Sequence, residues 1–116
     1  MKKIYHLSNC GTCQRILAEV KPKKDVQLQD IKTEKMTAEQ VDEMAKLAGS
    51  YEALFSRVAL KYRALELNTK KLTEKDYRNY IIEEYTFLKR PVAIVNNKIF
   101  IGNTKGNMEA LKKALA

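Results

Sequence analysis

The sequence predicts an α/β domain in which helices pack on the faces of a mixed β-sheet. Two observations predict this class. A strand-like run near the amino terminus leads directly into an amphipathic helical segment, and two β-rich runs near the carboxyl terminus are joined by Asn96-Asn97. With 116 residues, 45% of them hydrophobic, one domain of this class can bury a core without metals or disulfides.

The first part of the chain is predicted to be a β-α-β unit. Residues 3–7, KIYHL, have the apolar and aromatic character of a strand. The segment KPKKD at 21–25 ends the helix that follows, and VQLQDI at 26–31 alternates like a second strand. The helix between them has one apolar face with i, i+3, i+4, i+7 spacing, formed by Cys13, Ile16, Leu17 and Val20.

The middle of the chain is predicted to be helical. Thr37 and Gln40 form a capping-box signature, and Gly49 is a typical helix stop. The apolar stripe of this helix is Val41, Met44, Leu47 and Ala48. Thr73 and Asp76 can open another helix. Its expected inward face is Tyr77, Tyr80, Ile81 and Tyr85. Residues 51–65 are apolar enough for short helices between the two.

The carboxyl-terminal part is predicted to be a hairpin followed by a helix. PVAIV at 91–95 and KIFIG at 98–102 are β-rich, and asparagine tolerates the positive φ of a two-residue turn. Pro91 opens its strand, where it need not donate to a ladder, and the bond before it can be cis. The inward residues of the last helix are Met108, Leu111 and Leu115.

Composition excludes several classes of protein. No run approaches the roughly 18 apolar residues that span a bilayer, and MKKIYHLSNC lacks the apolar run of a signal peptide. We therefore expect a cytoplasmic protein without membrane partners. The net charge is +8, but the lysine pairs are spread along the chain rather than clustered with aromatic residues. Direct nucleic-acid binding is not expected, whereas attraction for anions or acidic partners is.

Both cysteines and the only histidine fall within residues 4–17, IYHLSNCGTCQRIL. Two cysteines and one histidine are too few for a four-ligand zinc site, so no metal is expected. In a reducing cytosol a close cysteine pair is more often catalytic than structural.

The C-x-x-C pair is interpreted as a redox site. Cys10 lies at the start of the predicted helix, where free N–H groups and the helix dipole favour the thiolate, so it is the expected nucleophile. Cys13, one turn later on the apolar face, is the expected resolving thiol. Gly11 allows close approach of a substrate, Thr12 adds little bulk, and His6 can stabilise the thiolate as a cation.

Two plainer interpretations stay open for these residues. Cys13 can be a small buried hydrophobic residue, and His6 an ordinary histidine at the end of a strand. An inactive protein that keeps only the fold is a third alternative.

The segments IYHLSNCGTC, LQDIKTEKMTAEQV and LKRPVAIVNNKIFIGN resemble the arsenate-reductase (ArsC) and Spx family of thioredoxin-like proteins over nearly the full length. The resemblance implies a thioredoxin-like core, about 1–35 and 86–116, with a helical insertion of about 36–85. It also implies that Pro91 is cis and faces the Cys10 loop.

In arsenate reductases the motif YHNPxCGTS carries the nucleophile, and Tyr5, His6, Cys10, Gly11 and Thr12 match it. Arg90 matches an arginine that helps to bind the oxyanion. A second family arginine falls at Ser56, with Arg57 adjacent, and a third falls at Gly102. Substrate contacts are therefore expected from Gly11, Thr12, Arg57, Arg90 and Pro91, and we expect weak or no arsenate turnover.

The resemblance implies two functions. The first is a thiol–disulfide oxidoreductase that acts on a small oxyanion or disulfide, binds no cofactor, and is reduced by glutathione and glutaredoxin or by thioredoxin. Cys13 restores the C-x-x-C dithiol of the Spx branch, which implies the second function. This is a redox-sensing regulator that binds the α subunit of RNA polymerase.

Overall fold

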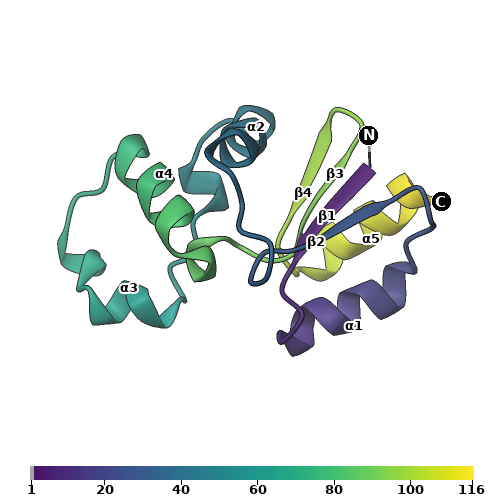
Figure 1. Ribbon diagram of the computed structural model, residues 1–116, viewed down its shortest axis with the longest axis horizontal. Helices are drawn as coiled ribbons and strands as arrows, with labels where there is room; N and C mark the ends of the chain where they lie inside the picture. The colour runs from purple at the N-terminus through teal and green to yellow at the C-terminus, as the bar shows by residue number, and fades with distance from the viewer. Residues whose placement is uncertain (1) are drawn as a thin grey trace. The chain divides into compact units, whose positions relative to one another are not determined.

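The computed structural model describes residues 2–116 and divides into two compact units (Figure 1). The first unit joins the chain up to Lys35 with Arg90–Ala116, and the second is Met36–Lys89. The cysteines, the histidine and Arg90 all belong to the first unit, so this unit is the one that positions the candidate site.

The first unit contains a four-stranded mixed sheet in the order β2-β1-β3-β4. The strands are β1 (Lys2–His6), β2 (Gln27–Asp30), β3 (Val92–Val95) and β4 (Lys98–Ile101). β1 runs parallel to β2 and antiparallel to β3, and β3 pairs antiparallel with β4. The predicted α/β class with a mixed sheet is confirmed.

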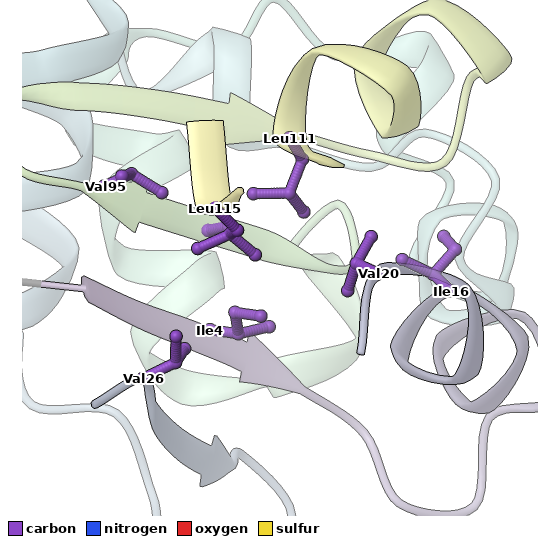
Figure 2. Close-up of a cluster of buried hydrophobic side chains, with 8 residues drawn as sticks. Ile4, Ile16, Val20, Val26, Val95, Leu111 and Leu115 are labelled. Atoms are coloured by element: carbon purple, nitrogen blue, oxygen red, sulfur yellow. The ribbon is translucent and has the colours of Figure 1, made fainter. Parts of the chain in front are cut away.

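Helices α1 (Gly11–Val20) and α5 (Lys105–Leu115) cover one face of this sheet. Figure 2 shows Ile4 and Val95 of the strands with Ile16 and Val20 of α1 and with Leu111 and Leu115 of α5. Val26 and Ala93 complete the cluster, and Met108 packs against it. The predicted inward faces of both helices are confirmed.

The turn between β3 and β4 and the end of β4 require unusual backbone angles. Asn96 has a φ of 58°, as expected for the first residue of a two-residue turn. Gly102, directly after β4, has a φ of 88°, which glycine adopts without a steric penalty. Its N–H donates to the carbonyl of Pro91 at 2.9 Å, which ties the end of the hairpin to its beginning.

The second unit is helical. It contains α2 (Ala38–Ala48), α3 (Leu60–Ala64) and α4 (Glu74–Glu83), with 3-10 turns η1 (Glu52–Leu54), η2 (Leu67–Thr69) and η3 (Tyr85–Phe87). Both predicted capping boxes are present, Thr37 with Gln40 and Thr73 with Asp76. Gly49 is the left-handed C-cap of α2, as predicted.

Aromatic side chains form much of the interior of the second unit. The ring of Phe55 stacks on Phe87 at 5.0 Å and lies 4.9 Å from Tyr77 and 6.0 Å from Tyr62. One expectation for α4 was wrong. Its inward face does not extend to Tyr85, because Glu84 has an extended backbone (φ −136°) and ends the helix at Glu83.

No helix among residues 2–116 combines the length and the apolar character needed to cross a bilayer.

Candidate active site

Cys10 lies where β1 passes into α1. A short loop of Leu7, Ser8 and Asn9 joins the two elements, and the Cys10 N–H closes it by donating to the Leu7 carbonyl at 3.0 Å. Cys10 is the N-cap of α1, with an extended backbone (φ −101°, ψ 115°), and its side chain is partly exposed. The first N–H groups of α1 therefore surround a sulfur that solvent can reach.

Cys13 faces the interior one turn further along α1. Its exposed fraction is 0%, and both cysteines are free thiols. Burial fits the plainer interpretation of Cys13 as a small hydrophobic residue, but its thiol also donates a hydrogen bond to the Cys10 sulfur. The two sulfurs are thus neighbours, which thiol–disulfide exchange requires.

The surroundings of Cys10 favour its thiolate. Partial burial raises the pKa of this thiol, but the Cys13 backbone N–H, the Cys13 thiol, the Thr12 N–H and the charge of Arg90 together bring the pKa below its ordinary value. The Cys10 side chain makes no capping hydrogen bond of regular geometry, so the two N–H groups act as oriented dipoles nearby.

The surroundings of Cys13 favour its protonated thiol. Burial is the main cause, and the neighbouring Cys10 adds to it, so the pKa of Cys13 is raised to about 11 despite opposing effects of the Leu7 backbone and Arg90. At neutral pH the pair therefore consists of one reactive sulfur and one protonated sulfur beside it.

Arg90 and Pro91 lie at the amino-terminal end of β3. The Arg90-Pro91 peptide bond is cis and Pro91 is buried, as the resemblance implied for the bond. The positive charge of Arg90 lowers the pKa of both cysteines, which places the guanidinium close to the pair. Among the described residues its Nη1 is buried and has no hydrogen-bond partner, which leaves this donor unsatisfied.

His6 is the last residue of β1 and is partly buried. It stands opposite Asp30, the last residue of β2, in the parallel register, and its charge contributes to lowering the pKa of Asp30. The structure thus places His6 beside a carboxylate that the sequence analysis did not identify. The position of Asp30 in the sequence could have indicated this, because it ends the strand predicted next to β1 and the carboxyl ends of neighbouring parallel strands meet at one edge of a sheet.

The remaining predicted residues differ in their placement. Gly11 and Thr12 form the first turn of α1 beside Cys10. Arg57 belongs to the second unit, where it forms an ion pair with Glu52 at 2.7 Å and a hydrogen bond with the Tyr77 hydroxyl at 3.1 Å. Its predicted contact with the substrate stays a prediction.

In residues 2–116 no three His, Cys, Asp or Glu side chains come together as metal ligands would. The described residues around Cys10 instead offer a thiol pair, oriented N–H groups and one guanidinium. This arrangement can carry out nucleophilic attack by sulfur and the formation of a disulfide.

The ArsC family model matches residues 5–111 of this sequence. The chain belongs to the ArsC family. The resemblance based on the three segments of the sequence is thereby confirmed, and family membership supports a thiol-dependent oxidoreductase. No curated protein matches the chain.

Solved structures of ArsC-related proteins have the same fold. A protein named YffB matches with a TM-score of 0.81 at 21% identity, over 100% of both chains. The arsenate reductase from Vibrio cholerae matches with a TM-score of 0.78 at 17% identity, over 98% of this chain and 97% of its own. An arsenate reductase (ArsC) related protein from Brucella melitensis matches with a TM-score of 0.72 at 24% identity, over 94% and 92%. At these identities the likeness shows the thioredoxin-like ArsC fold.

Proposed function

We propose that this ArsC-family protein is a thiol–disulfide oxidoreductase in which Cys10 is the nucleophile and Cys13 the resolving thiol. One observation carries the proposal: two neighbouring thiols have opposite environments. Cys10 is partly exposed with a lowered pKa, whereas Cys13 is fully buried with a pKa raised to about 11. Cys10 is therefore the more acidic thiol of the two and the one that a substrate can reach.

With a disulfide substrate, the reaction has two exchange steps. The Cys10 thiolate attacks one sulfur, the substrate S–S bond breaks, and one half leaves as a thiolate while the other stays bound to Cys10. Cys13 then loses its proton and attacks the Cys10 sulfur, which forms the Cys10–Cys13 disulfide and releases the second half. The two electrons gained by the substrate come from the two cysteines. An external dithiol, or two molecules of a monothiol, returns them.

The second step needs Cys13 to become more acidic than it is in the resting protein. The Cys10 thiolate contributes to the high pKa of Cys13, both by its charge and by accepting the hydrogen bond of the Cys13 thiol. Once Cys10 is bound to substrate, that charge is gone, so the pKa of Cys13 falls at the moment when Cys13 must attack.

The expected reductant is glutathione with glutaredoxin, or thioredoxin, and the substrate is expected to be a small disulfide or oxyanion. Arg90 supports an anionic substrate, because its buried Nη1 has no hydrogen-bond partner among residues 2–116. His6, the last residue of β1, is proposed to stabilise the Cys10 thiolate as a cation.

A redox titration with mass spectrometry tests the proposal. The reduced protein is equilibrated with glutathione buffers of increasing potential and free thiols are alkylated. The Cys10–Cys13 disulfide is detected by the loss of two hydrogen atoms and by the absence of alkylation on both cysteines. We expect one reversible transition in the wild type. Cys10→Ala should form no intramolecular disulfide, and Cys13→Ala should accumulate the mixed disulfide on Cys10. Absence of the disulfide in the wild type at every potential would overturn the proposal.

We expect arsenate reduction to be weak or absent. The resemblance puts a family arginine at Gly102, and glycine has no side chain. Among the described residues of the first unit, Arg90 supplies positive charge near Cys10. An assay with arsenate and either glutathione plus glutaredoxin or thioredoxin checks this. Robust turnover would show that one arginine suffices.

The C-x-x-C dithiol and the net charge of +8 favour one second function, redox-controlled binding of the RNA polymerase α subunit, as in the Spx branch. A pull-down of RNA polymerase with oxidised and with reduced protein separates the two functions. Capture that depends on the redox state supports the regulator, and equal or no capture contradicts it.

A further inference from the structure

Asp30 ties the end of β2 to the loop that carries Cys10. Its Oδ1 accepts a hydrogen bond from the Ser8 N–H at 3.3 Å and one from the Lys32 N–H at 3.1 Å. The Ser8 hydroxyl also donates to this carboxylate, which is the main reason that the pKa of Asp30 lies below its usual range. The carboxylate thus holds Ser8 by both its backbone and its side chain.

Ser8 is held from the helix side as well. The Gln14 side-chain amide donates to the Ser8 carbonyl, and the Cys10 N–H donates to the Leu7 carbonyl at 3.0 Å. Among these contacts, only the hydrogen bond with Asp30 joins the loop to a distant part of the sequence, because Asp30 is 22 residues from Ser8. The others are local and form wherever this turn and helix form.

The same carboxylate lies beside His6. Asp30 and His6 are register partners in the parallel pair, so their side chains leave the same face of the sheet, and the Ile31 N–H continues the ladder by donating to the His6 carbonyl at 2.9 Å. This is the face on which Ile4 meets Ile16 and Val20 of α1. Asp30 therefore sits where β1, β2 and the start of α1 come together.

We infer that Asp30 is a positioning residue for the nucleophile: it fixes the Ser8 loop so that the Cys10 sulfur stays among the N–H groups of the first turn of α1. This inference rests on the proposed function of Cys10. The lowered pKa of Cys10 depends on the nearby N–H groups of Thr12 and Cys13 and on the Cys13 thiol, and such short-range interactions weaken steeply when the sulfur moves.

The arrangement depends on a feature of this sequence. The arsenate-reductase motif YHNPxCGTS has proline at the position of Ser8. Proline has neither an N–H nor a hydroxyl to donate, whereas the serine found here supplies both contacts with Asp30. Ser8 and Asp30 thus act as a pair.

The charge and the hydrogen bonds of Asp30 have opposite effects on Cys10, which makes the inference testable. A negative charge near a thiolate raises its pKa, so removing only the charge should make Cys10 more reactive. Losing the anchor of the loop should instead make Cys10 less reactive. Asp30→Asn removes the charge and keeps an oxygen acceptor for Ser8, whereas Asp30→Ala removes both.

The experiment measures the rate of Cys10 alkylation by iodoacetamide as a function of pH, on the reduced full-length protein, with peptide mass readout. We expect Asp30→Ala to react at least about threefold more slowly at pH 7, with its pH profile shifted to higher pH. A threefold change is what a rise of about half a unit in the pKa of Cys10 produces in the thiolate fraction. Asp30→Asn should react as fast as the wild type or faster. A wild-type or faster rate for Asp30→Ala would overturn the inference.

Two further variants control the experiment. Asp25→Ala removes an exposed carboxylate that pairs with Lys2 at 3.1 Å and should leave the profile unchanged. If Asp30→Ala does not fold, as judged by circular dichroism, Asp30→Ser replaces it. Its shorter side chain can cap the local turn at Lys32 but not reach Ser8, so the same slowing is expected, and a wild-type rate contradicts the inference.

The outcomes separate this inference from the proposed function. If Cys10 of the wild type titrates like an ordinary thiol, the proposed function fails whatever Asp30 does. If Cys10 of the wild type has a lowered pKa and the Asp30 variants share it, the proposed function stands and the role of Asp30 is refuted.

Discussion

The N–H of Gly102 donates to the carbonyl of Pro91 at 2.9 Å, so the residue after the hairpin lies next to the proline that follows Arg90. The resemblance to arsenate reductases implies that a family arginine falls at the position of Gly102. The φ of Gly102, 88°, belongs to the left-handed region, which side chains with a Cβ rarely adopt. The backbone at this position therefore suits the glycine found here and disfavours an arginine.

We predict that Gly102→Arg destabilises the protein even though the space around Gly102 is open. Among the described residues, apart from its chain neighbours, no heavy atom would lie within 4 Å of a Cβ at Gly102, so the cost is conformational, about 1–2 kcal/mol. Urea denaturation measures it. Gly106→Arg is the matched control, because Gly106 lies in the first turn of α5 with equally open space and without a positive φ, and there the change should alter stability by less than about 0.5 kcal/mol. A Gly102→Arg protein as stable as the wild type would contradict this prediction.

Arg90→Gln should raise the pKa of Cys10, because the positive charge of Arg90 contributes to stabilising the thiolate. Arg90→Lys keeps a positive charge and should change the pKa less. The measurement is the ultraviolet absorbance of the thiolate during a pH titration of the reduced Cys13→Ala protein, in which Cys10 is the single cysteine. Identical titration curves for the Gln and Lys variants would show that the charge of Arg90 has no part in the shift.

The features that the sequence predicted correctly are encoded locally. The capping boxes at Thr37 and Thr73 each involve residues three positions apart, and the strand, turn and helix that position Cys10 form one continuous segment. Local hydrogen bonding and periodicity are enough to identify such features.

The features that were missed depend on pairing between distant segments. The contact of Asp30 with Ser8 exists only because β1 and β2 pair in parallel with His6 opposite Asp30. The alternation of VQLQDI was likewise not enough to assign burial. Leu28 is 50% exposed and Gln29 is 2% exposed, because β2 is an edge strand whose environment is set by the rest of the fold.

Alkaline pH should destabilise the fold through Cys13. A thiol with a folded-state pKa of about 11 and an ordinary value when unfolded binds more protons in the native state, so stability falls as pH rises from about 9 to about 11. The slope from this one group is at most about 1.4 kcal/mol per pH unit. Urea denaturation at intervals from pH 7 to pH 11 compares the wild type with Cys13→Ala.

Cys13→Ala removes this group and should show a shallower loss of stability with pH than the wild type. Tyrosines and lysines titrate in the same range, but they are common to both proteins, so the difference between the two curves isolates Cys13. Parallel curves would contradict a raised pKa for Cys13.

The side chain of Asp42 should stabilise the second unit only when it is ionised. It accepts two hydrogen bonds from Arg78 of α4, at 2.7 and 3.2 Å, and one from the Tyr51 hydroxyl at 2.6 Å. The Arg78 guanidinium, and next the Tyr51 hydroxyl, hold the pKa of Asp42 below its ordinary value. Its contribution to stability is thus present above the unfolded-state pKa and is lost as pH falls through the folded-state pKa.

Asp42→Asn should lower Tm at pH 7 and have the same Tm as the wild type near pH 2. A constant difference in Tm would exclude the ion pair as its cause.

Phe55 is expected to be the most costly aromatic residue to truncate in the second unit. Its exposed fraction is 0%, and it contacts the rings of Phe87, Tyr77 and Tyr62. Phe55→Ala therefore leaves a cavity among three rings and should cost about 3–5 kcal/mol in the free energy of unfolding, measured in urea. Val58→Ala is the control three residues away, where a side chain that is 92% exposed should change stability by less than about 0.5 kcal/mol. Similar losses for both variants would show that Phe55 does not anchor this core.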